Sequence, residues 1–546
     1  MKNRYILIGS LLLSVVLWLS GCRQPSSDTA FYKLKTSPEK VREIKTLELE
    51  SYRSEPQPDI PSVLELPEEP LDKIALELDQ CRALALENNL DIKVQLIAPA
   101  ITQESLNAER AKFEASFTTN LTYNKTDQPT ATTLDISGSG ADYSNVDMGV
   151  EIPFQTGGTI TFNLADSRTK TNSEYSIFNP SYSDRTSVSI SQYLLKNAGT
   201  RTNTHSIRIA EYEKYRTDIA TKMEVIRVLA AMDRVYWRLY AASKQVQVSK
   251  QRYELAKAQL ERAQRFVDAG QYAQIEINRA EAGQAESLQS IIIAENEMRD
   301  RQRETKQTLN KSGLETRGAT VITPVTEPNP IHYTFDPDRL IEQAFENRTE
   351  MLDYELRLAQ NISEIDFRRN QTLPLVTLNY TYNVNGLGPT RSDAYDLLTD
   401  HRFVDHYMGA SLQIPLGNQA AKSNLRAAVY SRMQTIASKE RQRSTIEVEV
   451  LNALDQVESN WLRVLAARQN TILQERLYQA EIRQFENGLT TSTDVLEAQS
   501  NFTNAQSSEI NALAEYQIAL VDLAYATGTL LGAAQVEWEP AAPAIK

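Results

Sequence analysis

The chain has 546 residues and a formal net charge of −13, and apolar residues make up 41% of it. This apolar content predicts an ordered protein, and the negative charge argues against nucleic acid as a partner. The two cysteines, Cys22 and Cys81, cannot provide a disulfide framework. Glycine (19) and proline (20) are scarce for this length, which favours long uninterrupted helices over many short elements.

The N-terminal residues have the features of an export signal. Lys2 and Arg4 begin a basic segment, and the apolar stretch 5–17 that follows is shorter than the roughly 20 residues of a membrane-spanning helix. A Leu-Ser-Gly-Cys sequence at 19–22 resembles the lipobox of bacterial lipoproteins. In that motif the signal is cleaved before the cysteine, and the thiol of Cys22 would carry a diacylglycerol. The alternatives are an ordinary signal peptide and an anchor helix.

The remainder is predicted to contain two halves with the same plan. Each half begins with short helices, continues with strands and ends in two very long helices that are joined at one glycine. Such self-similarity indicates an internal repeat of helical hairpins. The expected segments are a lipoprotein signal peptide at 1–21, an N-terminal tether or strap at 22–70, a first repeat at 71–313, a linker at 314–335, a second repeat at 336–530 and a C-terminal tail at 531–546.

The long helices are the strongest secondary-structure prediction. No glycine or proline occurs between Gly199 and Gly270, or between Gly417 and Gly488. Each interval can hold a helix of roughly 65 residues, which is about 100 Å long. Apolar residues recur there at three- and four-residue steps, as they do in coiled coils. The sequence predicts long helical hairpins at 200–311 and 419–528, and shorter helices at 71–88, 91–113, 336–346 and 349–370.

Alternating segments predict strands near 115–195 and near 374–416. From Val376 to Val384, apolar and aromatic residues alternate with threonine and asparagine. This pattern fits a soluble sandwich, and it equally fits a transmembrane barrel with an apolar face toward lipid. A barrel would need strands from several chains, because one half contributes too few to close it. Long polar loops are expected at 127–143, 169–185 and 385–401.

Several motifs resemble the TolC family of outer-membrane efflux and secretion channels. They are residues 485–499, residues 514–528 and the Leu-Gln-Ile-Pro-Leu sequence at 412–416. The resemblance covers roughly residues 72–530. It implies a mainly α fold with a transmembrane β part: a homotrimer with a shared outer-membrane β-barrel, of twelve strands in most members, on a long α-helical coiled-coil tunnel through the periplasm. An extra hairpin at 146–164 departs from this pattern, and with it each chain could contribute six strands instead of four.

The resemblance also implies where the functional site lies. In the family the helical-hairpin turns dock an adaptor protein and close the tunnel entrance, and here these turns are centred on Gly270 and Gly488. Asp494 and Glu497 share one face of the last helix, and Glu276 has the position equivalent to Asp494 in the first hairpin. Three copies would make rings of these carboxylates, which attract cations. The alternative is a solvated helix face with acids near its N-terminus.

One departure from the family concerns closure of the entrance. Relatives often close it with hydrogen bonds and ion pairs, and in one pattern an arginine stands two residues after the glycine of the second turn. Here Thr490 stands at that position, and Tyr272 stands at the matching position of the first turn. An ion pair from that position is therefore not expected.

Other residues point to packing rather than chemistry. His401 and His406 lack a third ligand at metal spacing, and Cys81 is expected to be a small buried apolar side chain. Trp237 and Trp461 are expected to pack within the long helices. The sequence has no nucleophile elbow, phosphate loop or paired catalytic constellation, so we expect neither an enzyme nor a cofactor.

These observations predict an outer-membrane channel subunit that exports substrates within a tripartite efflux or type I secretion system. Its expected location is the cell outer membrane, with a lipid anchor and an extension into the periplasm. The expected partners are two further copies of the chain, a periplasmic adaptor, an inner-membrane pump and outer-membrane lipid. The alternative is a non-channel, lipid-anchored coiled-coil protein of the periplasm, either structural or an adaptor. The exported substrate does not follow from the sequence, since pump and adaptor select it.

Overall fold

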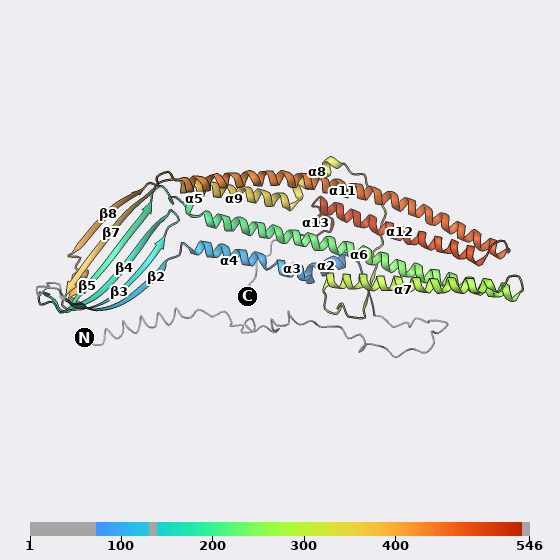
Figure 1. The fold of residues 1–546 in the computed structure, drawn as a ribbon, viewed down its shortest axis with the longest axis horizontal. Coiled ribbons are helices and arrows are strands. Elements are labelled where there is room, and N and C mark those ends of the chain that lie inside the picture. Colours follow the sequence, from blue (N-terminus) through green and yellow to red (C-terminus); the bar gives the residue numbers. More distant parts are fainter. Residues whose placement is uncertain (1–71, 130–138, 538–546) are drawn as a thin grey trace. The chain divides into compact units, whose positions relative to one another are not determined.

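The computed structural model describes residues 72–129 and 139–537. Cys22, the signal segment and the tether at 22–70 lie outside the described residues. The unit described here begins after Pro70, and Figure 1 shows its elements. The first half contains β1 (Lys73–Leu76), α2 (Leu78–Asn88), α3 (Leu90–Gln95), α4 (Ala98–Ala111), β2 (Ser116–Asp127), β3 (Gly140–Pro153), β4 (Gly158–Thr171), β5 (Ser181–Tyr193), α5 (Thr200–Asn203), α6 (His205–Asp268) and α7 (Ile275–Leu309). The second half contains β6 (Val321–Pro324), α8 (Pro337–Asn347), α9 (Thr349–Gln371), β7 (Leu375–Gly388), α10 (Arg391–Thr399), β8 (Val404–Gln413), α11 (Gln419–Glu486), α12 (Ser492–Ala526) and α13 (Leu530–Ala533).

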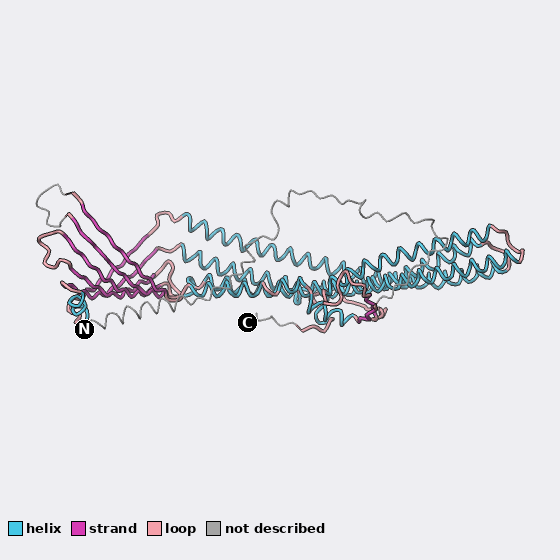
Figure 2. The backbone as a smooth tube through the Cα atoms, turned by 90° about the horizontal axis from the view of Figure 1, so that it is seen from below, coloured by secondary structure: helices cyan, strands magenta, loops and turns pink. Residues whose placement is uncertain are grey.

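The long helices confirm the prediction from glycine and proline spacing. Helix α6 has 64 residues and α11 has 68, and each folds back into a partner of 35 residues, α7 and α12. Helix α12 also packs against α6, so the two hairpins contact each other. Figure 2 shows the helices from a second direction, extending from the strands at one end to the hairpin turns at the other. Within the described ranges, no helix is both long and apolar enough to cross a membrane.

The segment 71–88 differs from its prediction. Residues Lys73–Leu76 form strand β1, and the helix begins only at Leu78. Strand β1 pairs in parallel with β6, which lies in the stretch that the sequence suggested was a plain linker. The reason is long-range pairing: four residues carry too little periodicity to reveal a strand whose partner is far away in the sequence.

The second sheet has six strands in the order β2-β3-β4-β5-β7-β8, and every neighbouring pair is antiparallel. Both strands of the extra hairpin join this sheet, because β3 and β4 lie between β2 and β5. Each chain therefore contributes six strands to it. The strands are longer than predicted, so the connections after β2 and β4 are shorter than the expected loops at 127–143 and 169–185.

The expected loop at 385–401 is wrong as a description of that segment. Strand β7 continues to Gly388, and α10 follows. The Thr390 side chain caps α10 by accepting a hydrogen bond from the Asp393 backbone N–H at 3.3 Å. Helix α10 packs against β7 so closely that a Cβ on Gly386 would lie 2.0 Å from the Ala394 carbonyl oxygen. The polar composition of the segment concealed a helix that is held by contact with the sheet.

One face of the six-stranded sheet is apolar over most of its length. Cross-strand partners on this face include Val376 with Leu412 and Ile160 with Ile190. No second sheet covers it within the described ranges, where the other sheet is the short β1-β6 pair. Large apolar side chains on this face are exposed in the single chain: Phe117, Leu121, Phe162, Leu164, Ile190, Tyr380, Met408 and Leu412.

The main core lies where α2, α6, α12 and the β1-β6 pair meet. Cys81 is fully buried there, as predicted. Trp237 also packs in this core, edge-on against Tyr236 and Tyr240. Trp461 contacts a second cluster between α11 and α12. The Tyr236 hydroxyl donates to the Leu76 carbonyl oxygen at 3.2 Å and accepts from the Thr326 N–H at 2.9 Å, which ties both short strands to α6.

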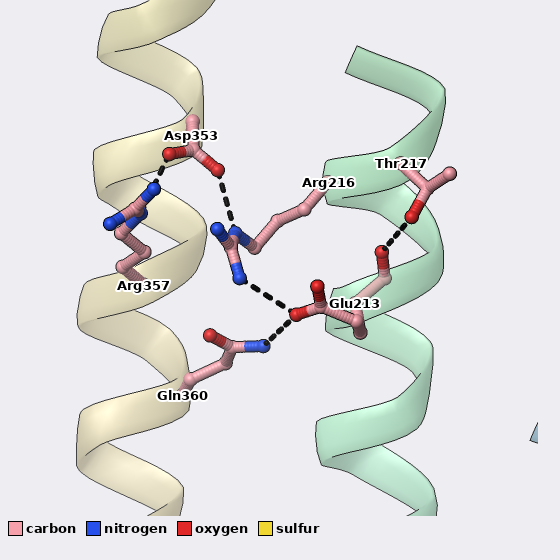
Figure 3. A network of polar contacts seen from close by, with 6 residues as sticks. All are labelled: Glu213, Arg216, Thr217, Asp353, Arg357 and Gln360. Atoms are coloured by element: carbon pink, nitrogen blue, oxygen red, sulfur yellow. Dashed lines mark hydrogen bonds and ion pairs between the residues drawn. The ribbon is translucent and has the colours of Figure 1, made fainter. Parts of the chain in front are cut away.

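Polar contacts join the first half to the second at the sheet-proximal part of α6. Arg216 of α6 donates to Asp353 of α9 at 2.6 Å and to Glu213 at 2.7 Å (Figure 3). Asp353 also accepts from Arg357 at 2.7 Å, and Glu213 accepts from Gln360 at 3.4 Å. This network holds α9 beside α6 through charged groups.

A buried ion pair attaches α2 to α6. Arg82 donates from Nε and from one terminal nitrogen to the two carboxylate oxygens of Asp233, both at 2.8 Å. The Asp233 side chain is fully buried, and this burial raises its pKa against the opposing effect of Arg82. A buried charge is costly once its partner is lost, so this pair constrains the position of α2.

We therefore expect Arg82→Met to lower the free energy of unfolding by roughly 3–5 kcal/mol, because it leaves the Asp233 carboxylate buried without a partner. Arg227→Met is the matched control, since Arg227 is half exposed where it pairs with Asp91 and Glu224, and exposed pairs contribute about 1 kcal/mol or less each. Denaturant unfolding of the purified protein measures both. Equal losses in the two variants would contradict a special role for the buried pair.

Candidate functional site at the helical-hairpin turns

The two long helices α6 and α11 end in the same backbone motif. In the first turn, the N–H of Gly270 donates to Val267 at 2.8 Å and the N–H of Gln271 donates to Phe266 at 2.9 Å. In the second turn, Gly488 and Leu489 donate to Phe485 and Gln484 in the same pattern, both at 3.0 Å. This is the Schellman motif, which satisfies the last helical carbonyls through a residue of left-handed conformation.

Glycine suits both turns because the backbone is left-handed at each. The φ angle is +71° at Gly270 and +74° at Gly488. A side chain at such a φ clashes with the following carbonyl, at a cost of roughly 1–2 kcal/mol. The sequence prediction that these glycines form the hairpin turns agrees with the structure.

Aromatic side chains join the two turns of one chain. The Tyr272 ring stacks on the Phe485 ring, with ring centres 5.0 Å apart, and Phe266 contacts both rings edge-on. The Tyr272 hydroxyl donates to the Phe485 carbonyl oxygen at 2.5 Å. Phe485 is fully buried. Tyr272 therefore connects the end of the first hairpin to the end of the second through both packing and a hydrogen bond.

Sequence reasoning missed this connection. It noted Tyr272 only as the first-turn residue that matches Thr490, the residue at the position of a family arginine in the second turn. The available signal was the pair of aromatic residues Phe266 and Phe485, which stand four and three positions before the two glycines. That spacing alone could not show that the rings meet, because their meeting depends on how the hairpins pack.

Glu276 lies between the hairpins. Its side chain is 8% exposed, and one carboxylate oxygen accepts from the Ser492 backbone N–H at 2.8 Å. The other oxygen accepts from Arg279 at 2.6 Å. Ser492 is the first residue of α12, so Glu276 of the first hairpin supplies a negative group to the helix N-terminus of the second. The sequence predicts Glu276 to be an exposed ring carboxylate like Asp494, and its burial in the single chain does not support that equivalence.

Asp494 and Glu497 are both exposed, in contrast to Glu276. Asp494 forms a capping box with Thr491: its carboxylate accepts from the Thr491 hydroxyl at 2.7 Å and from the Thr491 N–H at 2.8 Å. These bonds lower the pKa of Asp494, and the nearby Arg279 guanidinium acts in the same direction. Asp494 is thus a negatively charged group with a local structural role in starting α12.

No group of three or more His, Cys, Asp and Glu side chains that could hold a metal occurs among the described residues. His401 and His406 do not approach a metal geometry: His401 contacts the Thr399 carbonyl at 2.8 Å, and His406 contacts the Tyr380 hydroxyl at 2.9 Å. At the turns, the ends of the two hairpins pack together, and exposed carboxylates lie beside them.

The fold is that of outer-membrane channel proteins. Similar solved structures include the CmeC outer-membrane channel of Campylobacter jejuni (15% identity, TM-score 0.61, 83% of this chain and 86% of that chain) and the outer-membrane protein VceC of Vibrio cholerae (12%, 0.59, 83% and 96%). The open state of the MtrE outer-membrane channel of Neisseria gonorrhoeae is also similar (14%, 0.58, 83% and 89%). A search among curated protein sequences finds no match.

A family model matches the second half of the chain. Residues 340–529 match the family model described as outer membrane efflux protein. The matched range runs from α8 to α12 and includes Gly488, Asp494 and Glu497. The chain thus carries the domain of the outer membrane efflux proteins, and the resemblance to the TolC family is confirmed.

We expect Glu276→Ala to loosen the start of α12, because it leaves the buried Ser492 N–H without an acceptor, at a cost of roughly 1–3 kcal/mol. Hydrogen–deuterium exchange of residues 490–500 should rise in this variant. Glu497→Ala is the matched control, since Glu497 is exposed on the same helix, and its exchange should stay unchanged. Unaltered exchange in Glu276→Ala would show that the cap does not hold the two hairpins together.

Proposed function

We propose that this protein is an outer-membrane channel subunit that exports substrates as part of a tripartite efflux or type I secretion system. The observation that carries the proposal is the apolar, uncovered face of the six-stranded sheet. The chain leads from this sheet into two long helical hairpins. A non-channel coiled-coil protein would leave this apolar face without a function, because such a face exposed to water favours aggregation.

The sheet supports a shared β-barrel. From Val376 to Val384 the apolar face extends about 25–30 Å along the strand, which suits the hydrocarbon thickness that a tilted strand crosses. Strands β2 and β8 are the two edges of the sheet, and they run in opposite directions. The β8 edge of one copy can therefore pair antiparallel with the β2 edge of the next, and cyclic copies would close the sheet without a free edge.

A homotrimer is the assembly that the family resemblance favours. Three copies of a six-stranded sheet would form a barrel of eighteen strands, wider than the twelve-stranded barrel of most family members. Barrel diameter grows about linearly with strand number, and barrels of this size leave an aqueous channel. The polar face of the strands, rich in threonine, serine and asparagine, would then line that channel.

The hairpin turns would form the periplasmic end. We place the adaptor contact at the turns around Gly270 and Gly488, and the pump beyond it. Asp494 and Glu497 are exposed beside the second turn, so three copies would present rings of these carboxylates at the entrance. Glu276 would support this entrance from within, since it holds the N-terminus of α12, the helix that carries both other acids.

The first test is single-channel recording of the purified full chain in planar bilayers. We expect discrete cation-selective steps, with weaker cation selectivity in the Asp494→Asn/Glu497→Gln double variant, because the ring charge is removed while Asn can still accept the Thr491 hydrogen bonds. Glu276→Gln is the matched control: it removes one charge at a buried position, and it should leave the selectivity unchanged.

The outcomes separate the parts of the proposal. Steps with equal selectivity in all variants would keep the channel and reject the carboxylate rings. No steps from protein that is inserted and trimeric would indicate a channel that opens only with its adaptor. A monomer that never inserts would reject the channel and favour the periplasmic coiled-coil alternative.

We also propose that the mature protein is attached to the outer membrane through a lipid on Cys22. The lipobox-like sequence at 19–22 supports this anchor. Metabolic labelling with a fatty acid should mark the unaltered protein, and Cys22→Ser should abolish the label because the modified thiol is gone. Cys81→Ser is the control, since the Cys81 thiol is fully buried. Persistent labelling of Cys22→Ser would reject the anchor.

A further inference from the structure

Two aspartates lie next to each other on the two central strands of the six-stranded sheet. Asp166 of β4 and Asp184 of β5 are direct cross-strand partners. Direct partners point to the same face, with Cβ atoms about 4.5–5.5 Å apart. Both stand on the apolar face, near the end of the sheet away from the long helices, one pair beyond Leu164 and Thr186. Like charges in this arrangement destabilise a sheet unless another group offsets them.

Asp184 is buried without a partner. It is 7% exposed, and its Oδ1 atom has no hydrogen-bond partner. The Oδ1 atom of Asp166 is likewise buried and unpartnered. Among the described residues, the cation that pairs with either acid is Arg391 of α10, whose Nε lies 3.2 Å from Oδ2 of Asp166. The two carboxylates therefore share one arginine, and one buried oxygen of each has no hydrogen-bond partner.

Helix α10 lies over the sheet face that carries this pair of aspartates. Gly386 of β7 is the cross-strand partner of Asp184 on its other side. A Cβ on Gly386 would meet the Ala394 backbone of α10, so α10 lies on the same face as both acids. Arg391 reaches Asp166 from this helix and also lies over the Tyr182 ring. Coverage by α10 explains why Asp184 is buried although neighbouring side chains on the same face are exposed.

Burying an ionised carboxylate without a partner costs several kcal/mol. A cationic group that contacted both Oδ1 atoms would offset this cost. Arg391 lies against Oδ2 of Asp166 and over the Tyr182 ring, and neither Oδ1 atom accepts a hydrogen bond from it. A hard divalent cation needs oxygen ligands, and magnesium is commonly held by one or two carboxylates while it keeps several waters.

We propose that Asp166 and Asp184 bind one hard divalent cation, of the magnesium or calcium class, through their Oδ1 atoms. The cation offsets the excess negative charge and gives both orphan oxygens a partner, with water completing the coordination. Because Arg391 of α10 contacts the same acid, the cation also strengthens the attachment of α10 to the sheet. The site lies at the opposite end from the hairpin turns, and it does not depend on the channel proposal.

Manganese(II) is a suitable probe, because carboxylate and water ligands suit Mn²⁺ as they do Mg²⁺ and Ca²⁺. The experiment titrates Mn²⁺ into the purified full chain and follows the free ion by electron paramagnetic resonance. We expect a saturable site with one Mn²⁺ per chain, from which Mg²⁺ or Ca²⁺ displaces the probe. Asp184→Asn and Asp166→Asn should each weaken binding by on the order of tenfold to a hundredfold.

Asp142→Asn is the matched control, because Asp142 lies on the same face of neighbouring β3 and already pairs with Lys125 at 4.0 Å. It should bind Mn²⁺ as the unaltered chain does. Equal binding in all variants, or no saturable site, would overturn the proposal. A more stable Asp184→Asn protein without any cation effect would assign the pair a shared proton instead. If Asp184→Asn fails to fold, Asp166→Asn decides, since Asp166 is only partly buried.

Discussion

The two edges of the six-stranded sheet are the constraint on which the arrangement depends. Strands β2 and β8 each have a neighbour on one side only within the described chain. An edge strand presents unpaired N–H and C=O groups, and here the adjoining face is apolar as well. The described part of the chain leaves both features unsatisfied, and the proposed assembly of further copies in lipid would satisfy them. Each long hairpin begins shortly after a strand of this sheet, since α11 follows β8, and α6 follows β5 and the short α5.

The far ends of the hairpins are held by local chemistry. Each turn closes with a glycine of left-handed conformation, and the two turns then meet through Tyr272 and Phe485. The Glu276 carboxylate of the first hairpin contacts the N-terminus of α12 in the second hairpin. The two halves of the chain therefore meet at this end through a few specific contacts. Further from the turns, charged groups such as Arg216 and Asp353 connect the halves. Breaking these few contacts would loosen the proposed entrance without unfolding the helices.

The same sheet carries two kinds of surface. Its apolar face suits lipid along most of the strands, whereas its outer end holds Asp166 and Asp184 beneath α10. Burial of charge next to an apolar face is costly, and proteins keep such groups only where something compensates them. The positions of β7 beside α10 are glycine because a side chain there would collide with the helix. This end of the sheet thus differs in chemistry from the rest of the apolar face, although the alternation of residues continues unchanged through both.

The sequence by itself determined the long helices, their glycine turns and the alternating strands. These features depend on local rules: a helix continues until glycine or proline interrupts it, and a strand alternates in steps of two. It also carried the family resemblance in residues 485–499. Only the tertiary structure decided the pairing of β1 with β6, the place of β3 and β4 in the sheet, the helix within 385–401 and the burial of Glu276. Each of these depends on contacts between residues that are distant in the chain, and such contacts leave no periodic pattern in the sequence.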